Sequence, residues 1–237
     1  MSAPLTQSLR VRRINVGSAL TEYEVGWELQ RQIHEGVVGG TEPPTALMLE
    51  HSPVFTAGRR TQPGDRPLNG SRVIDVDRGG RITWHGPGQL VCYPIVPLPE
   101  PFDVVAHVRR LEEIAIRTCE DFGIATTRIE GRSGVWCSGD SARTERKIAA
   151  IGVRVARSVT MHGLALNVDC DLGWSEQIVP CGIADAGVTS MALELGRALS
   201  LTDRALSLTD VADAFEGHLR EVLEPTLGEH PSVGFLA

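Results

Sequence analysis

Lysine and arginine together number 23 in this chain, and only one of them, Lys147, is a lysine. An arginine stays protonated at any ordinary pH, whereas a desolvated lysine amine can release and recover a proton. If Lys147 begins a strand that runs to Ala156, two-residue alternation places it on one apolar face with Ala149, Ile151, Val153 and Val155. We therefore interpret Lys147 as a candidate for proton transfer. The alternative is a codon bias toward arginine that left one lysine by chance.

The cysteines are odd in number and form no CxxC pair, so neither a disulfide framework nor a metal site such as zinc is expected. Cys181 differs from the others because it lies between Pro180 and Gly182, which is typical of a turn. A turn exposes the thiol, and exposure is the first condition for thiol reactivity. Cys181 is thus open to a nucleophilic as well as a structural role. Structural roles are expected for Cys92, Cys119, Cys137 and Cys170.

The segment RGGRITWHGPGQ, from Arg78 to Gln89, combines four glycines and a proline with a histidine. Such glycines let the backbone approach a ligand closely, although tight turns explain them equally well. The segment matches neither the phosphate-binding loop nor the dinucleotide fingerprint. His85 could be a catalytic base, but we favour a role in orienting a turn or bonding to substrate.

Helical and strand patterns alternate irregularly along the chain. Thr21 and Glu24 predict a capping box before a helix that carries Val25, Leu29 and Ile33 and ends near Gly36. A second helix is predicted between Asp103 and Gly123, and a third between about Thr209 and Pro225. The remaining apolar runs predict strands at 46–50, 72–76, 90–96, 126–130, 134–138, 147–156 and 162–168.

Because many strands follow one another without a helix between them, we predict an α+β fold with a largely antiparallel or mixed sheet flanked by helices. No linker or repeat interrupts the 237 residues, so one catalytic domain over residues 1–237 is expected. The net charge of -7 argues against nucleic-acid or membrane-surface binding. The N-terminal residues lack the apolar core of a signal peptide, and no apolar run could span a bilayer, so a cytoplasmic protein is expected.

Four motifs occur in a fixed order between about Leu47 and Ser190: RGGRITWHGPGQLVCYP, Lys147 with AIG, HGLALNV and IVPCGI. Together they resemble the lipoyl(octanoyl) transferases of the biotin/lipoate protein ligase superfamily. The resemblance implies transfer of an octanoyl group from octanoyl-acyl carrier protein to lipoyl domains of 2-oxoacid dehydrogenase E2 subunits and of the glycine cleavage H protein. It also implies that Cys181 is the acyl-carrying nucleophile and that Lys147 lowers its pKa. Neither a metal nor a cofactor is implied.

The same resemblance implies which residues contact the acyl substrate. They are Arg78, Gly79, Gly80, Arg81, Ile82, Thr83, Trp84 and His85, then Ala150, Ile151 and Gly152, and then Gly163, Leu164 and Ala165. Candidate contacts for an acidic carrier protein are Arg59, Arg60, Arg143 and Arg146.

Three other functions remain open on the sequence. An ATP-dependent lipoate or biotin ligase would use Lys147 to bind the adenylate and would need no catalytic cysteine, but the GGGA and GRGRxGR signatures are absent. A cysteine hydrolase would pair Cys181 with His85 or His162 and release the acyl group to water. A non-catalytic acyl-binding protein would not depend on Cys181.

Overall fold

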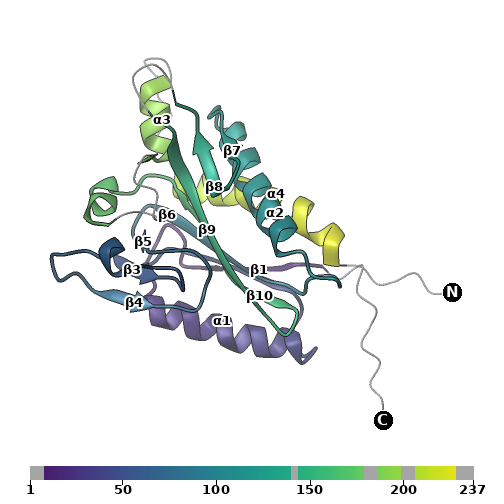
Figure 1. The fold of residues 1–237 in the computed structure, drawn as a ribbon. Coiled ribbons are helices and arrows are strands. Elements are labelled where there is room, and N and C mark those ends of the chain that lie inside the picture. The colour runs from purple at the N-terminus through teal and green to yellow at the C-terminus, as the bar shows by residue number, and fades with distance from the viewer. Residues whose placement is uncertain (1–7, 140–143, 179–185, 199–205, 228–237) are drawn as a thin grey trace, which may run out of the picture.

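The computed structural model describes residues 8–139, 144–178, 186–198 and 206–227. Its larger sheet runs in the order β1-β2-β6-β10-β9-β8-β7, with β11 paired to β9 (Figure 1). Within it, β1 with β2 and β11 with β9 are parallel, and the other pairs are antiparallel. The strands are β1 (Arg10–Ile14), β2 (Thr45–Leu49), β6 (Gln89–Ile95), β7 (Thr127–Ile129), β8 (Arg132–Cys137), β9 (Arg146–Ala156), β10 (Val159–Asn167) and β11 (Gly187–Val188).

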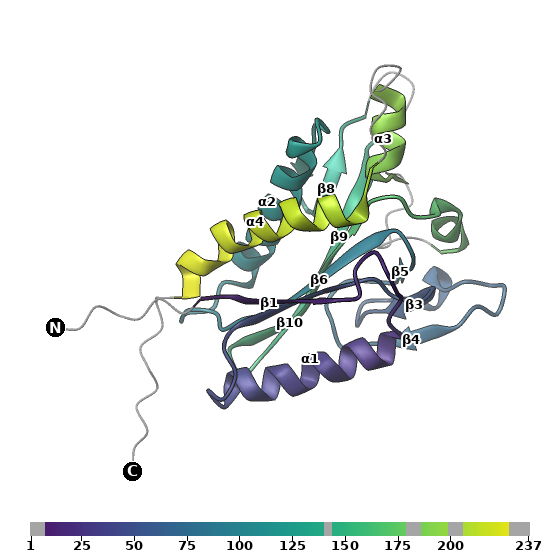
Figure 2. The same cartoon turned by 180° about the vertical axis from the view of Figure 1, so that it is seen from behind.

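Helices cover both faces of this sheet. On one face lies α1 (Tyr23–Val38), where Ile33 packs against Leu47 and Ile95. On the other face lie α2 (Val104–Asp121) and α4 (Leu208–Leu227), with Leu111 and Phe215 in the largest core cluster (Figures 1 and 2). The short α3 (Met191–Ala198) follows β11. The predicted α+β fold with a mixed, largely antiparallel sheet is confirmed.

A second, smaller sheet has the order β4-β3-β5 and lies beside one end of α1 (Figure 2). It consists of β3 (Val54–Ala57), β4 (Val73–Asp75) and β5 (Thr83–His85). Two short 3-10 turns, Pro63–Asp65 and Leu172–Gln177, lie outside the sheets. The residues between β4 and β5 form the glycine-rich loop of the sequence motif, so this sheet holds both ends of that loop.

The start of α1 differs from the prediction. Glu22 is its N-cap residue and its side chain makes no capping hydrogen bond, so the capping box of Thr21 and Glu24 is wrong. The backbone of Thr21 instead bridges to His51, which ties the residue before the helix to the end of β2. Val25 is also 62% exposed, because the buried face of α1 carries Gly26, Gln30, Ile33 and His34 with Tyr23.

The other two predicted helices are present. Asp103 caps α2 by accepting a hydrogen bond from the backbone N–H of Ala106 at 2.8 Å, and Gly123 follows its end at φ +77°. The C-terminal helix α4 passes through Pro225 and ends two residues beyond the predicted stop. Among the described residues, no helix combines the length and apolarity that a bilayer crossing requires.

Candidate functional site

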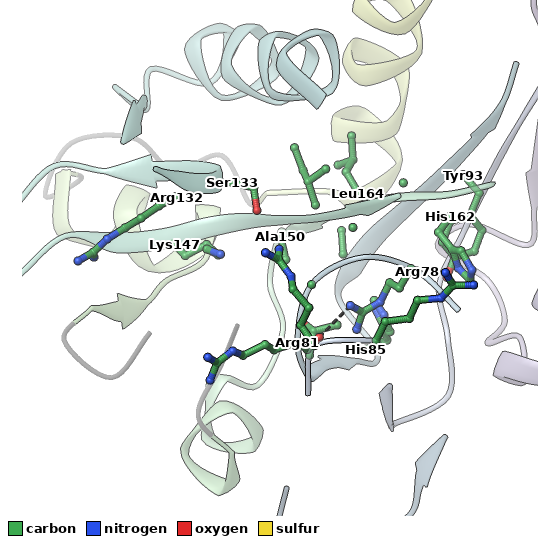
Figure 3. Close-up of a pocket in the computed structure, with 18 of the residues that line it drawn as sticks. Arg78, Arg81, His85, Tyr93, Arg132, Ser133, Lys147, Ala150, His162 and Leu164 are labelled. Carbon is green, nitrogen blue, oxygen red and sulfur yellow. Dashed lines mark hydrogen bonds between the residues drawn. The ribbon is translucent and has the colours of Figure 1, made fainter. Parts of the chain in front are cut away.

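A cavity of about 520 Å³ opens between the glycine-rich loop, β9 and β10 (Figure 3). Its walls come from seven separate parts of the chain, and they include most of the substrate contacts expected from the sequence. These are Arg78, Gly80, Arg81, Thr83, His85, Ala150, Ile151, Gly152, Gly163, Leu164 and Ala165, and the expected catalytic residue Lys147 lies in the wall with them.

Three residues of the expected set lie behind the cavity wall. Ile82 is fully buried against Phe55, and Trp84 belongs to the same apolar cluster. The Gly79 N–H donates to the Val153 carbonyl at 2.9 Å, which joins the loop to β9. Their positions indicate that Gly79, Ile82 and Trp84 support the loop, while their neighbours in sequence face the cavity.

Lys147 lies in this wall and is only 6% exposed. Its Nζ atom is 4.7 Å from the centroid of the Trp136 ring, a distance at which cation and ring attract each other. The predicted alternation is wrong, however, because the pairing of β8 with β9 shifts register between Trp136 and Val135. Ile148 and Ala149 both enter the core as a result, so Lys147 shares the cavity with Ala150 and Gly152.

Gly134 makes room for the lysine. A Cβ atom there would lie 2.5 Å from the Ala149 carbonyl oxygen and 3.2 Å from Cε of Lys147. The residue also has φ +111°, which side chains rarely adopt. Its N–H donates to the buried carboxylate of Glu112 at 3.0 Å, which fixes this part of β8 beside the lysine.

A buried hydrogen-bond chain fixes the tautomer of His85. The side-chain amide of Asn167 donates to the Thr189 carbonyl at 2.9 Å, so its oxygen accepts from Nε2 of Gln89 at 2.8 Å. The same Gln89 nitrogen also donates to the Trp84 carbonyl at 3.3 Å. The Gln89 oxygen must then accept from Nδ1–H of His85 at 2.8 Å.

The Nε2 atom of His85 is therefore left with a lone pair. Burial lowers the pKa of His85 well below its usual range, and the positive charges of nearby groups such as Arg78 act in the same direction. The ring stacks on Tyr23 at a centroid distance of 5.9 Å, which holds its plane. His85 is thus a neutral ring that offers an acceptor in the cavity wall.

A second histidine was not singled out for substrate contact. His162, on β10, lines the cavity with only 1% of its surface exposed and takes φ +58°. Its Nε2–H donates to Asp77 at 2.8 Å, and Asp77 also pairs with Arg154. Burial lowers the pKa of His162, so the ring is neutral and its Nδ1 is an acceptor without a partner among the described residues. Backbone strain of this kind is concentrated at functional sites.

Arg78 organises the glycine-rich loop from within. Its guanidinium donates to the carbonyls of Thr56 and Gly79 and to the Thr56 hydroxyl. It also donates to the Arg81 carbonyl at 2.8 Å (Figure 3). The side chain is 7% exposed, and these four hydrogen bonds all run to neutral oxygens. Arg78 therefore gives the loop its shape and adds positive charge to the cavity wall.

The proposed nucleophile, Cys181, lies outside the described residues. The four other cysteines are buried, as expected for structural thiols. Burial raises the pKa of Cys119 and of Cys170 to about 12 and raises that of Cys92 further, so these thiols stay protonated at neutral pH.

The candidate carrier contacts divide into three kinds. Arg59 and Arg60 are exposed at the cavity mouth, as a docking contact requires. Arg146 is buried and paired with Glu194 at 3.0 Å, so its expected role as a carrier contact is wrong. Arg143 lies outside the described residues.

Comparisons with known proteins agree on a family. A family model described as the lipoyl protein ligase A/B catalytic domain matches residues 22–220. A Salinispora tropica protein named octanoyltransferase is 57% identical over 203 residues, which cover 86% of this chain and 92% of that one. An octanoyltransferase of Mycobacterium avium is 55% identical over 210 residues, 88% of either chain.

Solved structures show the same fold at low sequence identity. Lipoate-protein ligase A bound with ATP is similar with a TM-score of 0.63 at 13% identity, covering 94% of this chain and 92% of that one. The bi-partite lipoate protein ligase of Thermoplasma acidophilum gives 0.61 at 14% identity, covering 94% and 90%. These likenesses concern the fold alone, and they confirm the expected lipoate ligase-like architecture.

Proposed function

The chain belongs to the octanoyltransferases of the lipoyl protein ligase A/B family, and on this premise we propose that it moves an octanoyl group from an acyl carrier protein to lipoyl domains. The acceptors are lysines of the lipoyl domains of 2-oxoacid dehydrogenase E2 subunits and of the glycine cleavage H protein. The transfer passes through a thioester on Cys181, and the whole chain acts as one catalytic domain in the cytoplasm.

The observation that carries the proposal is the position of Lys147. A buried amine in the wall of a cavity of about 520 Å³ can act on a reacting group that is shielded from water. The described residues Ile178 and Val188, which flank the segment that contains Cys181, line a small neighbouring cavity with Lys147. Val188 also pairs with Lys147 across β11 and β9. This supports a Cys181–Lys147 pair.

In the first half-reaction, the Cys181 thiolate attacks the carrier-bound thioester, and the carbon–sulfur bond to the phosphopantetheine breaks. The ammonium of Lys147 favours the thiolate and then protonates the departing sulfur. The acyl-enzyme has a similar energy to the donor, because one thioester replaces another. No ATP is consumed.

In the second half-reaction, the now neutral Lys147 removes a proton from the incoming lysine amine, which attacks the acyl carbon. Cys181 leaves as a thiolate, and an amide forms. Because an amide is more stable than a thioester, the step runs downhill. The Nε2 acceptor of His85 is suited to hold an N–H group of the donor arm or the acceptor amine in line.

The direct test is transfer to a purified lipoyl domain, followed by mass spectrometry of that domain. With octanoyl-acyl carrier protein and no ATP, the domain should gain one octanoyl group on a single lysine. Transfer that requires ATP and free octanoate would instead identify a ligase. Release of free octanoate at the same rate with and without the domain would identify a hydrolase.

A further inference from the structure

The charge of the cavity is one-sided. Five arginines and Lys147 line it, and no aspartate or glutamate does so among the described residues. The chain as a whole has a net charge of -7, so the positive charge of the cavity lining is opposite in sign to that of the whole protein. Clefts lined by one sign of charge attract ligands of the opposite sign. The arginines are Arg59, Arg60, Arg78, Arg81 and Arg132.

Two of these arginines are available to bind a ligand. Arg78 is committed to the loop backbone, Arg81 pairs with Asp65 at 3.3 Å, and Arg132 lies over Trp136. In contrast, the side chains of Arg59 and Arg60 are exposed and have no hydrogen bond or ion pair with any described residue. They are adjacent cations at the mouth of the cavity that holds Lys147.

The fold holds the backbone of this pair in place. The Arg59 N–H donates to the Arg78 carbonyl at 3.1 Å, and the Arg60 N–H donates to the Gly80 carbonyl at 3.0 Å. Gly58 permits the contact, since a Cβ atom there would lie 2.6 Å from the Gly80 oxygen. The backbone of both arginines is thus tied to the loop that lines the cavity.

We propose that Arg59 and Arg60 form an anion subsite for the phosphodiester of the donor's phosphopantetheine arm. The inference rests on the proposed function. The donor thioester must reach Lys147 inside the cavity, while the phosphate at the other end of the arm stays near the mouth. Guanidinium groups bind phosphate oxygens through paired, charge-assisted hydrogen bonds. Binding of the phosphate there would position the thioester near Lys147 even if the enzyme made no contact with the carrier protein itself.

The test compares two small donors that differ only in this group: octanoyl-phosphopantetheine and octanoyl-pantetheine. Single-turnover acylation by both small donors and by octanoyl-acyl carrier protein is measured for the wild type, for R59Q, R60Q and the double variant, and for R12Q. Arg12 is an exposed arginine on β1 without an ion pair to any described residue, so R12Q controls for loss of a surface charge.

With the phosphorylated donor, the second-order rate constant of single-turnover acylation should be about tenfold or more lower in the double variant than in the wild type, which corresponds to about 1.4 kcal/mol. With octanoyl-pantetheine it should stay within about twofold of the wild type, and R12Q should match the wild type with both donors. Added salt should slow the wild type with the phosphorylated donor and narrow the gap to the double variant.

Equal losses with both donors, or no loss with the phosphorylated one, would overturn the subsite. A loss confined to the carrier-bound donor would do so too, since it would assign Arg59 and Arg60 to carboxylates on the carrier surface. If carrier-bound octanoate acylates the wild type and octanoyl-phosphopantetheine does not, the subsite is also wrong. In each of these outcomes the wild type is still acylated, so the proposed function stands. Absence of acylation by every donor would refute the proposed function itself.

Discussion

Lys147 is the residue on which the proposed chemistry depends most. Replacing it by alanine removes both its charge and its proton. Replacing it by arginine keeps the charge, but a guanidinium cannot exchange a proton at neutral pH. We predict that Lys147→Arg and Lys147→Ala both lower single-turnover acylation at least a hundredfold, as is typical for loss of a general acid.

Rapid-quench kinetics with octanoyl-acyl carrier protein would measure this loss, and circular dichroism would show that the variants fold. An arginine variant with near wild-type rates would reduce the role of Lys147 to electrostatics.

Gln89 is predicted to act through His85. In Gln89→Met the Nδ1–H of His85 loses its acceptor, so the ring can take the other tautomer and present a donor where the wild type presents a lone pair. The KM for octanoyl-acyl carrier protein should rise by about three- to tenfold while kcat changes less, since one ordinary hydrogen bond is lost. Steady-state kinetics would measure both constants. An unchanged KM would mean that His85 Nε2 does not bind substrate.

At the scale of elements, the register shift between β8 and β9 is what brings Lys147 to the cavity. Gly134 lies next to that shift and has φ +111°. A Cβ atom added there would lie 2.5 Å from the Ala149 carbonyl oxygen. We predict that Gly134→Ala lowers the free energy of unfolding by about 1–3 kcal/mol, from backbone strain and overpacking together. It should also lower the acylation rate, because Lys147 must move.

Urea denaturation monitored by tryptophan fluorescence would give the change in free energy. Gly217→Ala is the matched control, because Gly217 lies inside α4 and a Cβ added there would meet no described atom within 4 Å other than its own helix backbone and chain neighbours. This change should stabilise the protein by about 0.5–1 kcal/mol. A Gly134→Ala protein as stable and active as the wild type would contradict the role given to the shift.

Much of the secondary structure follows from local pattern. The long apolar runs that became β6, β9 and β10 were predictable, because alternation and β-branched residues act within one segment. The strands β3 and β5 were not, since they depend on pairing with each other. The register shift in β9 was equally hidden, because it is a property of a strand pair.

The site was predictable in part and for a different reason. The single lysine already indicated Lys147, whereas the substrate contacts in the loop and in the β10 segment were predicted only through resemblance to a family. The partners that set the chemistry lie far apart in sequence: Asp77 is 85 residues from His162, and Gln89 is 78 from Asn167. Spacing along one chain carries no information on such pairs until the strands are assembled.

For the whole molecule, buried histidines predict how stability depends on pH. Burial lowers the pKa of His51 and of His107 to about 4, whereas an unfolded histidine titrates near 6.5. Between pH 6.5 and 4 the unfolded chain therefore binds protons that the folded protein does not. The free energy of unfolding should fall as the pH drops through this window, by about 3 kcal/mol for each histidine.

Chemical denaturation at a series of pH values would measure the slope. In His107→Leu, the slope of the free energy of unfolding against pH should decrease by the contribution of about one bound proton. The variant should lose little stability near pH 7, because Nε2 of His107 is buried without a partner among the described residues. An unchanged slope in this variant would show that His107 is not buried as the structure has it.

The central claim is a covalent acyl-enzyme on Cys181 formed with the help of Lys147, and intact-protein mass spectrometry after mixing with octanoyl-acyl carrier protein tests it most directly. The wild type should gain one octanoyl group, which peptide mapping assigns to Cys181 and which a lipoyl domain then removes. Cys181→Ser should gain no thioester, while Cys92→Ser and Cys119→Ser should be acylated like the wild type. A wild-type protein that transfers octanoate at full rate without acquiring this mass, or a Cys181→Ser protein that transfers it normally, would contradict the account.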